Sequence, residues 1–167
     1  MKKITYTLFL SFMMFTVHAQ VVINEYSAAN LNVILDNYQR TEDWVELYNM
    51  GETEVDLSGY HLSDKESKPA KWEIPTGTTI PAMGYLTFWC SGRDEACDNN
   101  YHTNFKLTQT KTNETLILSD PSEDVLSSVD VQVVFAESSW CRLTDGSDEW
   151  RICKTPSLNA SNNGTEQ

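Results

Sequence analysis

The fold is decided by residues 43–49, which read Asp43-Trp44-Val45-Glu46-Leu47-Tyr48-Asn49. This stretch is dense in the aromatic and β-branched residues that favour strands. Side chains alternate between the two faces of a strand, so we expect Trp44 and Glu46 to face one way and Val45 and Leu47 the other. Residues 49–52 are typical of a turn. The stretch therefore predicts a short strand with two different faces.

Similar short strands are predicted on both sides of this one, and no window has the spacing of an amphipathic helix. Clusters of Gly, Pro, Asn and Asp separate them, and residues 91–103 form a polar loop. The other predicted strands are residues 21–26, 55–62, 71–74, 85–90, 104–107, 114–118, 125–135 and 138–142. This pattern predicts an all-β fold, a β-sandwich.

The first nineteen residues are typical of a signal peptide. Lys2 and Lys3 precede an apolar run at residues 4–17, which is short for a membrane helix. We expect cleavage after Ala19, which would leave Gln20 as the first mature residue. The alternative is a retained anchor, but no stop-transfer cluster of charges follows the run.

The remaining chain is long enough for one domain with a sizeable core. We place this domain at residues 20–160 and expect residues 161–167, rich in Asn, Ser and Gly, to form a flexible tail or linker. No second apolar stretch could span a membrane. Such a chain could be one module of a longer exported protein.

The charge of the chain excludes two classes of partner. There are 24 acidic and 12 basic residues, a net charge of −12. Nucleic-acid binding needs a basic patch, and docking on anionic lipid needs clustered Lys and Arg. We therefore expect no nucleic acid as a partner and no membrane insertion after cleavage of the signal peptide.

Four cysteines follow the predicted signal peptide, an even number that suggests disulfides in an exported protein. Three pairings are possible. We favour Cys90–Cys97 and Cys141–Cys153, because each would close a short polar segment between strands. A zinc site is disfavoured, since the chain has no pair of cysteines two residues apart and few histidines.

A set of short motifs follows one order along residues 21–160. They are residues 23–25 (INE), 43–49 (DWVELYN), 55–60 (VDLSGY), 62–64 (LSD), Trp72, 74–75 (IP), 77–78 (GT), Ile80, 84–86 (GYL), 102–107 (HTNFKL), Ser139, Arg142, 144–146 (TDG), Trp150 and 155–156 (TP). Together they resemble the lamin tail domain family, in particular its exported bacterial members.

The resemblance implies an immunoglobulin-like β-sandwich that serves as a non-catalytic accessory module. Bacterial members are often joined to exported hydrolases or other surface domains. Ser157 stands where these members usually carry glycine, so we expect the final turn to differ. No binding residue of the family maps onto this chain.

Two candidate sites follow from the acidic residues. Glu25, Asp43 and Glu46 could form a carboxylate group for acid–base chemistry, but they belong to the motifs that define the fold, so we expect a structural role. We expect no cofactor. Calcium is the one candidate, on a loop with Asp94 and Asp98 and on another with Asp145 and Asp148, although neither loop has the full spacing of a calcium-binding loop.

We expect no catalytic residues, and predict a secreted or cell-surface module that binds or tethers a protein or a cell-surface glycan. A carbohydrate-binding module is one alternative, and it would need an exposed, coplanar pair of Trp or Tyr rings. A small exported hydrolase is another. It would need a deep pocket with two or more convergent titratable groups.

Overall fold

The computed structural model describes residues 19–111 and 113–164. Except for Ala19, the predicted signal peptide lies outside them and stays a prediction. No helix occurs in the described residues, and none could therefore cross a membrane there. The strands are β1 (Val21–Ser27), β2 (Trp44–Asn49), β3 (Val55–Asp56), β4 (His61–Ser63), β5 (Trp72–Glu73), β6 (Thr79–Ile80), β7 (Tyr85–Trp89), β8 (Glu95–Cys97), β9 (Asn100–His102), β10 (Thr115–Ser119), β11 (Val125–Asp130), β12 (Ser139–Arg142) and β13 (Trp150–Cys153).

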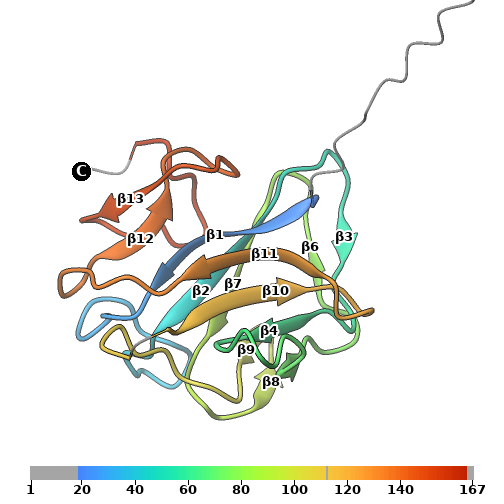
Figure 1. Cartoon of the computed structure of the whole chain (residues 1–167), viewed down its shortest axis with the longest axis horizontal. Helices are drawn as coiled ribbons and strands as arrows, with labels where there is room; N and C mark the ends of the chain where they lie inside the picture. Colours follow the sequence, from blue (N-terminus) through green and yellow to red (C-terminus); the bar gives the residue numbers. More distant parts are fainter. Residues whose placement is uncertain (1–18, 112, 165–167) are drawn as a thin grey trace, which may run out of the picture.

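The strands form two main sheets that pack face to face as an immunoglobulin-like β-sandwich (Figure 1). The larger sheet has the order β13-β12-β1-β2-β7-β9-β8, and the smaller has the order β11-β10-β4-β5. Strands β3 and β6 form a separate pair. The predicted all-β fold is confirmed.

Strand β2 lies near the middle of the larger sheet and has the two faces that its sequence predicts. Val45 and Leu47 belong to the hydrophobic core between the sheets, whereas Trp44 and Glu46 do not. All six residues of β2 are nevertheless buried, so both of its faces are covered. The outer face of this strand is therefore part of the interior of the protein.

Four predictions about strands are wrong. The predicted strand at residues 55–62 is divided into β3 and β4, which belong to different sheets. Residues 104–107 form no strand, only a single bridge between Ser91 and Lys106. Strands β8 and β9 lie within the predicted polar loop. Strand β11 ends at Asp130 rather than at residue 135, because the chain must leave the smaller sheet to reach β12 in the larger one. Val131 N still donates to the Glu114 carbonyl, but side chains accept the hydrogen bonds that follow: Gln132 N donates to the Tyr26 hydroxyl and Val134 N to Gln109 Oε1.

Candidate functional site

Two glutamates lie side by side on the outer face of the larger sheet. A β-bulge between Ile23 and Glu25 shifts the register of β1, so that Glu25 pairs with Glu46 on β2. Both are fully buried. The Asn24 amide donates to Glu46 at 3.3 Å and to Asp145, in the turn between β12 and β13, at 3.0 Å. We call Glu25, Glu46 and Asp145 the acidic cluster.

Glu25 accepts hydrogen bonds from protein donors on both of its oxygens. The Ser139 hydroxyl donates to it, as do the hydroxyl and the backbone N–H of Ser157. Burial raises the pKa of Glu25 because it penalises the charged form, and the hydrogen bonds offset only part of this effect.

Burial also raises the pKa of Glu46, and the neighbouring charge of Glu25 raises it further, to about 8. Hydrogen bonds from the Asn159 backbone N–H and the Asn24 amide act in the opposite direction. Two carboxyls this close cannot both ionise readily, so the Glu25–Glu46 pair holds a proton at neutral pH.

Asp145 behaves differently because four donors surround it. Its Oδ1 accepts from the Asn24 amide and from Asn162 N, each at 3.0 Å. Its Oδ2 accepts from the Tyr85 hydroxyl at 2.8 Å and the Ser161 hydroxyl at 2.5 Å. Burial by itself would raise the pKa of Asp145, but these hydrogen bonds together lower it, so Asp145 stays ionised.

The segment that follows β13 covers the acidic cluster, and we call its residues 154–164 the C-terminal strap. It crosses three strands: Ser157 contacts Glu25 on β1, and Asn159 contacts Glu46 on β2 and accepts a hydrogen bond from Thr87 on β7 at 3.0 Å. Further along, the Asn162 side chain is 0% exposed. The predicted domain boundary at residue 160 stays a prediction, although Ser161 and Asn162, just beyond it, both donate to Asp145.

The acidic cluster is built as a structural network. General acid–base catalysis requires a carboxyl that can reach a substrate, but the oxygens of the cluster accept hydrogen bonds from the protein beneath the strap. Asp43, the third predicted member, takes no part. It accepts a hydrogen bond from Asn30 N, and burial raises its pKa to about 6.

A serine–histidine pair that sequence reasoning missed lies near the β7–β8 connection. The Ser91 hydroxyl is 2.9 Å from His102 Nδ1, and His102 Nε2 is 2.8 Å from Asn37 Oδ1. Ser91 and His102 are both buried, and burial lowers the pKa of His102. These two contacts bring together Asn37, Ser91 and His102 from three separate segments, so no local sequence motif predicts the pair. Because a substrate carbonyl could not reach Ser91, we assign it a structural role.

The four calcium candidates do not converge. Asp94 Oδ1 accepts a hydrogen bond from the Trp72 indole at 3.0 Å, and Asp145 is enclosed by its four donors. Asp98 is exposed, and Asp148 lies 3.9 Å from the Arg142 guanidinium. Within residues 19–111 and 113–164, no three His, Cys, Asp or Glu side chains are grouped so that they could hold a metal ion.

One of the two predicted disulfides is present. Cys141 on β12 is bonded to Cys153 on β13, immediately before the strap. The predicted Cys90–Cys97 bond is wrong for this structure, in which Cys90 is a buried thiol and Cys97 an exposed one. Cys90 is held among core residues and burial raises its pKa, whereas Cys97 lies on the edge strand β8.

Among the aromatic residues of the described chain, Trp140 and Trp150 are partly buried against the hydrophobic core, and Tyr38 is 42% exposed. Trp44, Trp72 and Trp89 are buried. Tyr48 and Tyr85 stack with their ring centroids 4.9 Å apart, but Tyr48 is buried and the Tyr85 hydroxyl is bonded to Asp145. This arrangement argues against sugar stacking at these rings.

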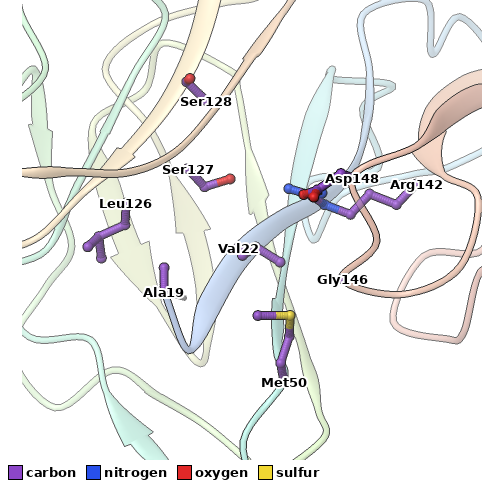
Figure 2. Close-up of a pocket in the computed structure, with 9 residues that line it drawn as sticks. All are labelled: Ala19, Val22, Met50, Leu126, Ser127, Ser128, Arg142, Gly146 and Asp148. Atoms are coloured by element: carbon purple, nitrogen blue, oxygen red, sulfur yellow. The ribbon is translucent and has the colours of Figure 1, made fainter. Parts of the chain in front are cut away.

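The cavities among the described residues include one of about 490 Å³, whose lining contains Glu66, Glu114 and Asp130. The one in Figure 2 has a volume of about 240 Å³ and lies where β1 approaches β11. Its only ionisable side chains are Arg142 and Asp148, and Arg142 Nε already donates to the Ile23 carbonyl at 2.7 Å. Its lining residues are Ala19, Val22, Met50, Leu126, Ser127, Ser128, Arg142, Gly146 and Asp148. A hydrolase would need a deeper pocket with converging titratable groups.

Exposed apolar side chains gather instead on two adjacent loops at one end of the sandwich. These loops join β1 to β2 and β11 to β12, and they lie side by side at the left of Figure 1. Glu137 N donates to the Ala29 carbonyl at 3.0 Å, which ties the two together. The exposed fractions are 59% for Leu31, 63% for Val33, 47% for Leu35, 71% for Val133 and 68% for Phe135. We call these five residues the apolar end.

Comparison with known families agrees with this architecture. The sequence model of the Lamin Tail Domain family matches residues 16–132. The chain belongs to the lamin tail domain family. The match includes all of β1 to β11 and the loop that carries Leu31, Val33 and Leu35, whereas β12, β13, the disulfide and the strap follow it in the sequence. No curated protein matches this lamin tail domain.

Membership of the family is consistent with a non-enzymatic immunoglobulin-like domain. It also explains why the acidic residues of β1 and β2 look like an active site. Glu25 and Glu46 lie in the motifs that build the sheet, and their carboxyls hold the bulge, the turn and the strap in place.

Proposed function

We propose that this lamin tail domain is an exported, non-catalytic module that binds a protein at the cell exterior through its apolar end. The observation that carries the proposal is the grouping of Leu31, Val33, Leu35, Val133 and Phe135 on two adjacent loops. Large apolar patches are rare on soluble monomers and often mark interaction sites, so a group of exposed apolar side chains on adjacent loops favours binding there.

The surroundings of the apolar end have the composition of a protein interface. Tyr38, in the same loop as Leu35, is 42% exposed, and the Arg93 guanidinium lies 4.4 Å from its ring centroid. Aromatic residues and arginine are enriched in protein interfaces and often carry much of the binding energy. These features favour a protein over a glycan as the partner.

The opposite end of the sandwich is acidic, which favours an orientation in which the apolar end faces the partner. Residues 50–62 and 119–125 include six acidic residues and no Lys or Arg. The two segments adjoin, since His61 Nδ1 lies 3.3 Å from the Asp120 carbonyl oxygen. An anionic surface would repel this end, so the apolar end would face the partner.

Export is supported by the predicted signal peptide and by the Cys141–Cys153 disulfide, since disulfides persist in oxidising compartments. Sequencing the N-terminus of the protein recovered from outside the cytoplasm tests this part. We expect Gln20 as its first residue, and an intact residue 1 in the cytoplasmic fraction would contradict export.

Binding is tested with two matched double variants of the exported protein. Val133→Ser/Phe135→Ser removes apolar surface from the apolar end, and Val125→Ser/Met83→Ser removes side chains that are each 54% exposed elsewhere. All four positions are exposed, so both variants should keep the wild-type stability within about 0.5 kcal/mol per site.

Binding to isolated envelopes of the source cells is then measured over a range of protein concentrations. We expect the first variant to bind at least ten-fold more weakly and the second to bind as the wild type does. Equal binding by all three proteins would overturn the assignment of the apolar end.

A further inference from the structure

The C-terminal strap makes several of its polar contacts with carboxyl groups, in addition to hydrogen bonds with Thr87 and the Asn24 carbonyl. Ser157 donates to Glu25, the Asn159 backbone donates to Glu46, and Ser161 and Asn162 donate to Asp145. The protonation of two buried carboxyls, Glu25 and Glu46, and of the half-buried Asp145 therefore affects how well this segment binds the domain.

The two ends of the strap lie over carboxyls of opposite character. Beneath Ser157 and Asn159, the Glu25–Glu46 pair is too close and too dehydrated to carry two charges easily. Beneath Ser161 and Asn162, Asp145 is stabilised as an anion by its donors. Rising pH therefore places a second, uncompensated charge beneath the first end, where burial outweighs the hydrogen bonds and favours hydration, and strong acid weakens the second contact.

We propose that the C-terminal strap is a proton-controlled latch, which lies closed over β1, β2 and β7 while the Glu25–Glu46 pair holds a proton and opens locally when both carboxyls ionise. Opening lets water reach the two charges without unfolding the sandwich. The Cys141–Cys153 disulfide keeps the base of the strap attached to β12.

The charged groups that face the latch determine whether rising pH opens it or closes it. None of the groups that shift the pKa of Glu46 is a cation, so no positive charge among them compensates for a second negative one. The Arg151 guanidinium donates to the Asn162 carbonyl at 3.0 Å, at the far end of the strap from Glu46. The ionisable groups around the strap are Glu25 on β1, Glu46 on β2, Tyr85 on β7, Asp145 in the β12–β13 turn, Arg151 on β13 and Lys154 in the strap itself.

Thermodynamic linkage fixes the shape of the pH dependence. Glu46 has a pKa of about 8 beneath the closed strap, and the pKa falls towards 4.5 as the site becomes hydrated. Opening therefore releases a proton between these limits, and the opening constant rises by up to about ten-fold per pH unit before it levels off above pH 8.

Hydrogen exchange at single amides of the mature protein measures this opening directly, once each rate is corrected for its intrinsic pH dependence. The backbone N–H groups of Ser157, Asn159 and Asn162 report on the strap, and that of Leu118 on β10 reports on the core. We expect protection of the Asn159 amide to fall between pH 5 and 8 while it stays less protected than Leu118. Protection that does not change with pH, or that always equals that of Leu118, would overturn the latch.

Two variants identify the proton involved. Glu46→Gln carries a neutral isostere, so we expect protection of the Asn159 amide to be nearly constant between pH 6 and 8. Glu54→Gln, at an exposed position away from the strap, is the matched control and should follow the wild type. An unchanged slope in Glu46→Gln would contradict the assignment to this carboxyl.

A third variant tests the latch if Glu46→Gln does not fold. Ser157→Gly removes the hydroxyl that donates to Glu25 but keeps the backbone donor. We expect it to lower the protection of the strap amides at every pH and to leave Leu118 unchanged. If the strap amides of this variant were as protected as those of the wild type, the contact between Ser157 and Glu25 would not be what holds the strap closed.

Discussion

Glu46→Gln should flatten the dependence of folding stability on pH. The folded protein raises the pKa of Glu46 from 4.5 to about 8, chiefly through burial and then through the charge of Glu25. A folded-state pKa above the unfolded value means that the native state holds the proton more tightly. The stabilisation is therefore complete below about pH 4.5 and is lost as the pH rises through 8.

The size of this effect follows from the two pKa values. Each pH unit between them is worth about 1.4 kcal/mol, so the wild type should lose at most about 5 kcal/mol of unfolding free energy from this group. In a domain of this length, 1 kcal/mol corresponds to roughly 2–4 °C in Tm. A fall in Tm of roughly 10–20 °C between pH 5 and pH 9 is thus the upper limit.

Urea denaturation followed by tryptophan fluorescence at pH 5, 6, 7, 8 and 9 provides the measurement. Glu46→Gln should lose much less stability over this range than the wild type, and Glu54→Gln should lose as much as the wild type. Because general repulsion among the many acidic residues affects all three proteins, the comparison isolates Glu46. Parallel curves for Glu46→Gln and the wild type would refute the reasoning.

Three further predictions concern other parts of the molecule. Replacing Cys141 and Cys153 together by serine should lower the unfolding free energy by about 3 kcal/mol, measured in urea, since the disulfide closes a loop of 12 residues. Gly146→Ala should destabilise by roughly 1–3 kcal/mol in the same assay, because Gly146 has a φ of 73° and an added Cβ would lie 2.5 Å from Met50 Sδ. A fluorophosphonate probe should leave Ser91 unmodified in the native protein, as judged by intact mass, and stoichiometric labelling would reopen the hydrolase alternative.

The parts of the fold that sequence predicts best are those in which local pattern and tertiary position agree. The alternation around Val45 and Leu47 predicts the inward face of β2, and the motifs around it predict the family. Residues 131–135 mislead because they alternate like a strand. Their backbone groups instead bond to Tyr26 and Gln109, which a sequence cannot bring together.

The candidate site was only partly accessible to sequence reasoning. The pairing of Glu25 with Glu46 follows from neighbouring strands, but the part played by Asp145 depends on donors up to 121 residues away in the chain. The polar composition of residues 161–164 suggests a free tail. The burial of Asn162 depends instead on contacts distant in the sequence, since its backbone N–H donates to Asp145 and its side-chain amide to the Asn24 carbonyl.

The central claim, that the apolar end binds a protein at the cell exterior, is tested most directly by site-specific photocrosslinking on intact source cells. A photoreactive side chain at position 135 probes the apolar end, and one at position 83 is the control at a comparably exposed apolar site. We predict a discrete protein adduct from position 135 that position 83 does not give. No adduct from position 135, or the same adduct from both positions, would contradict the claim.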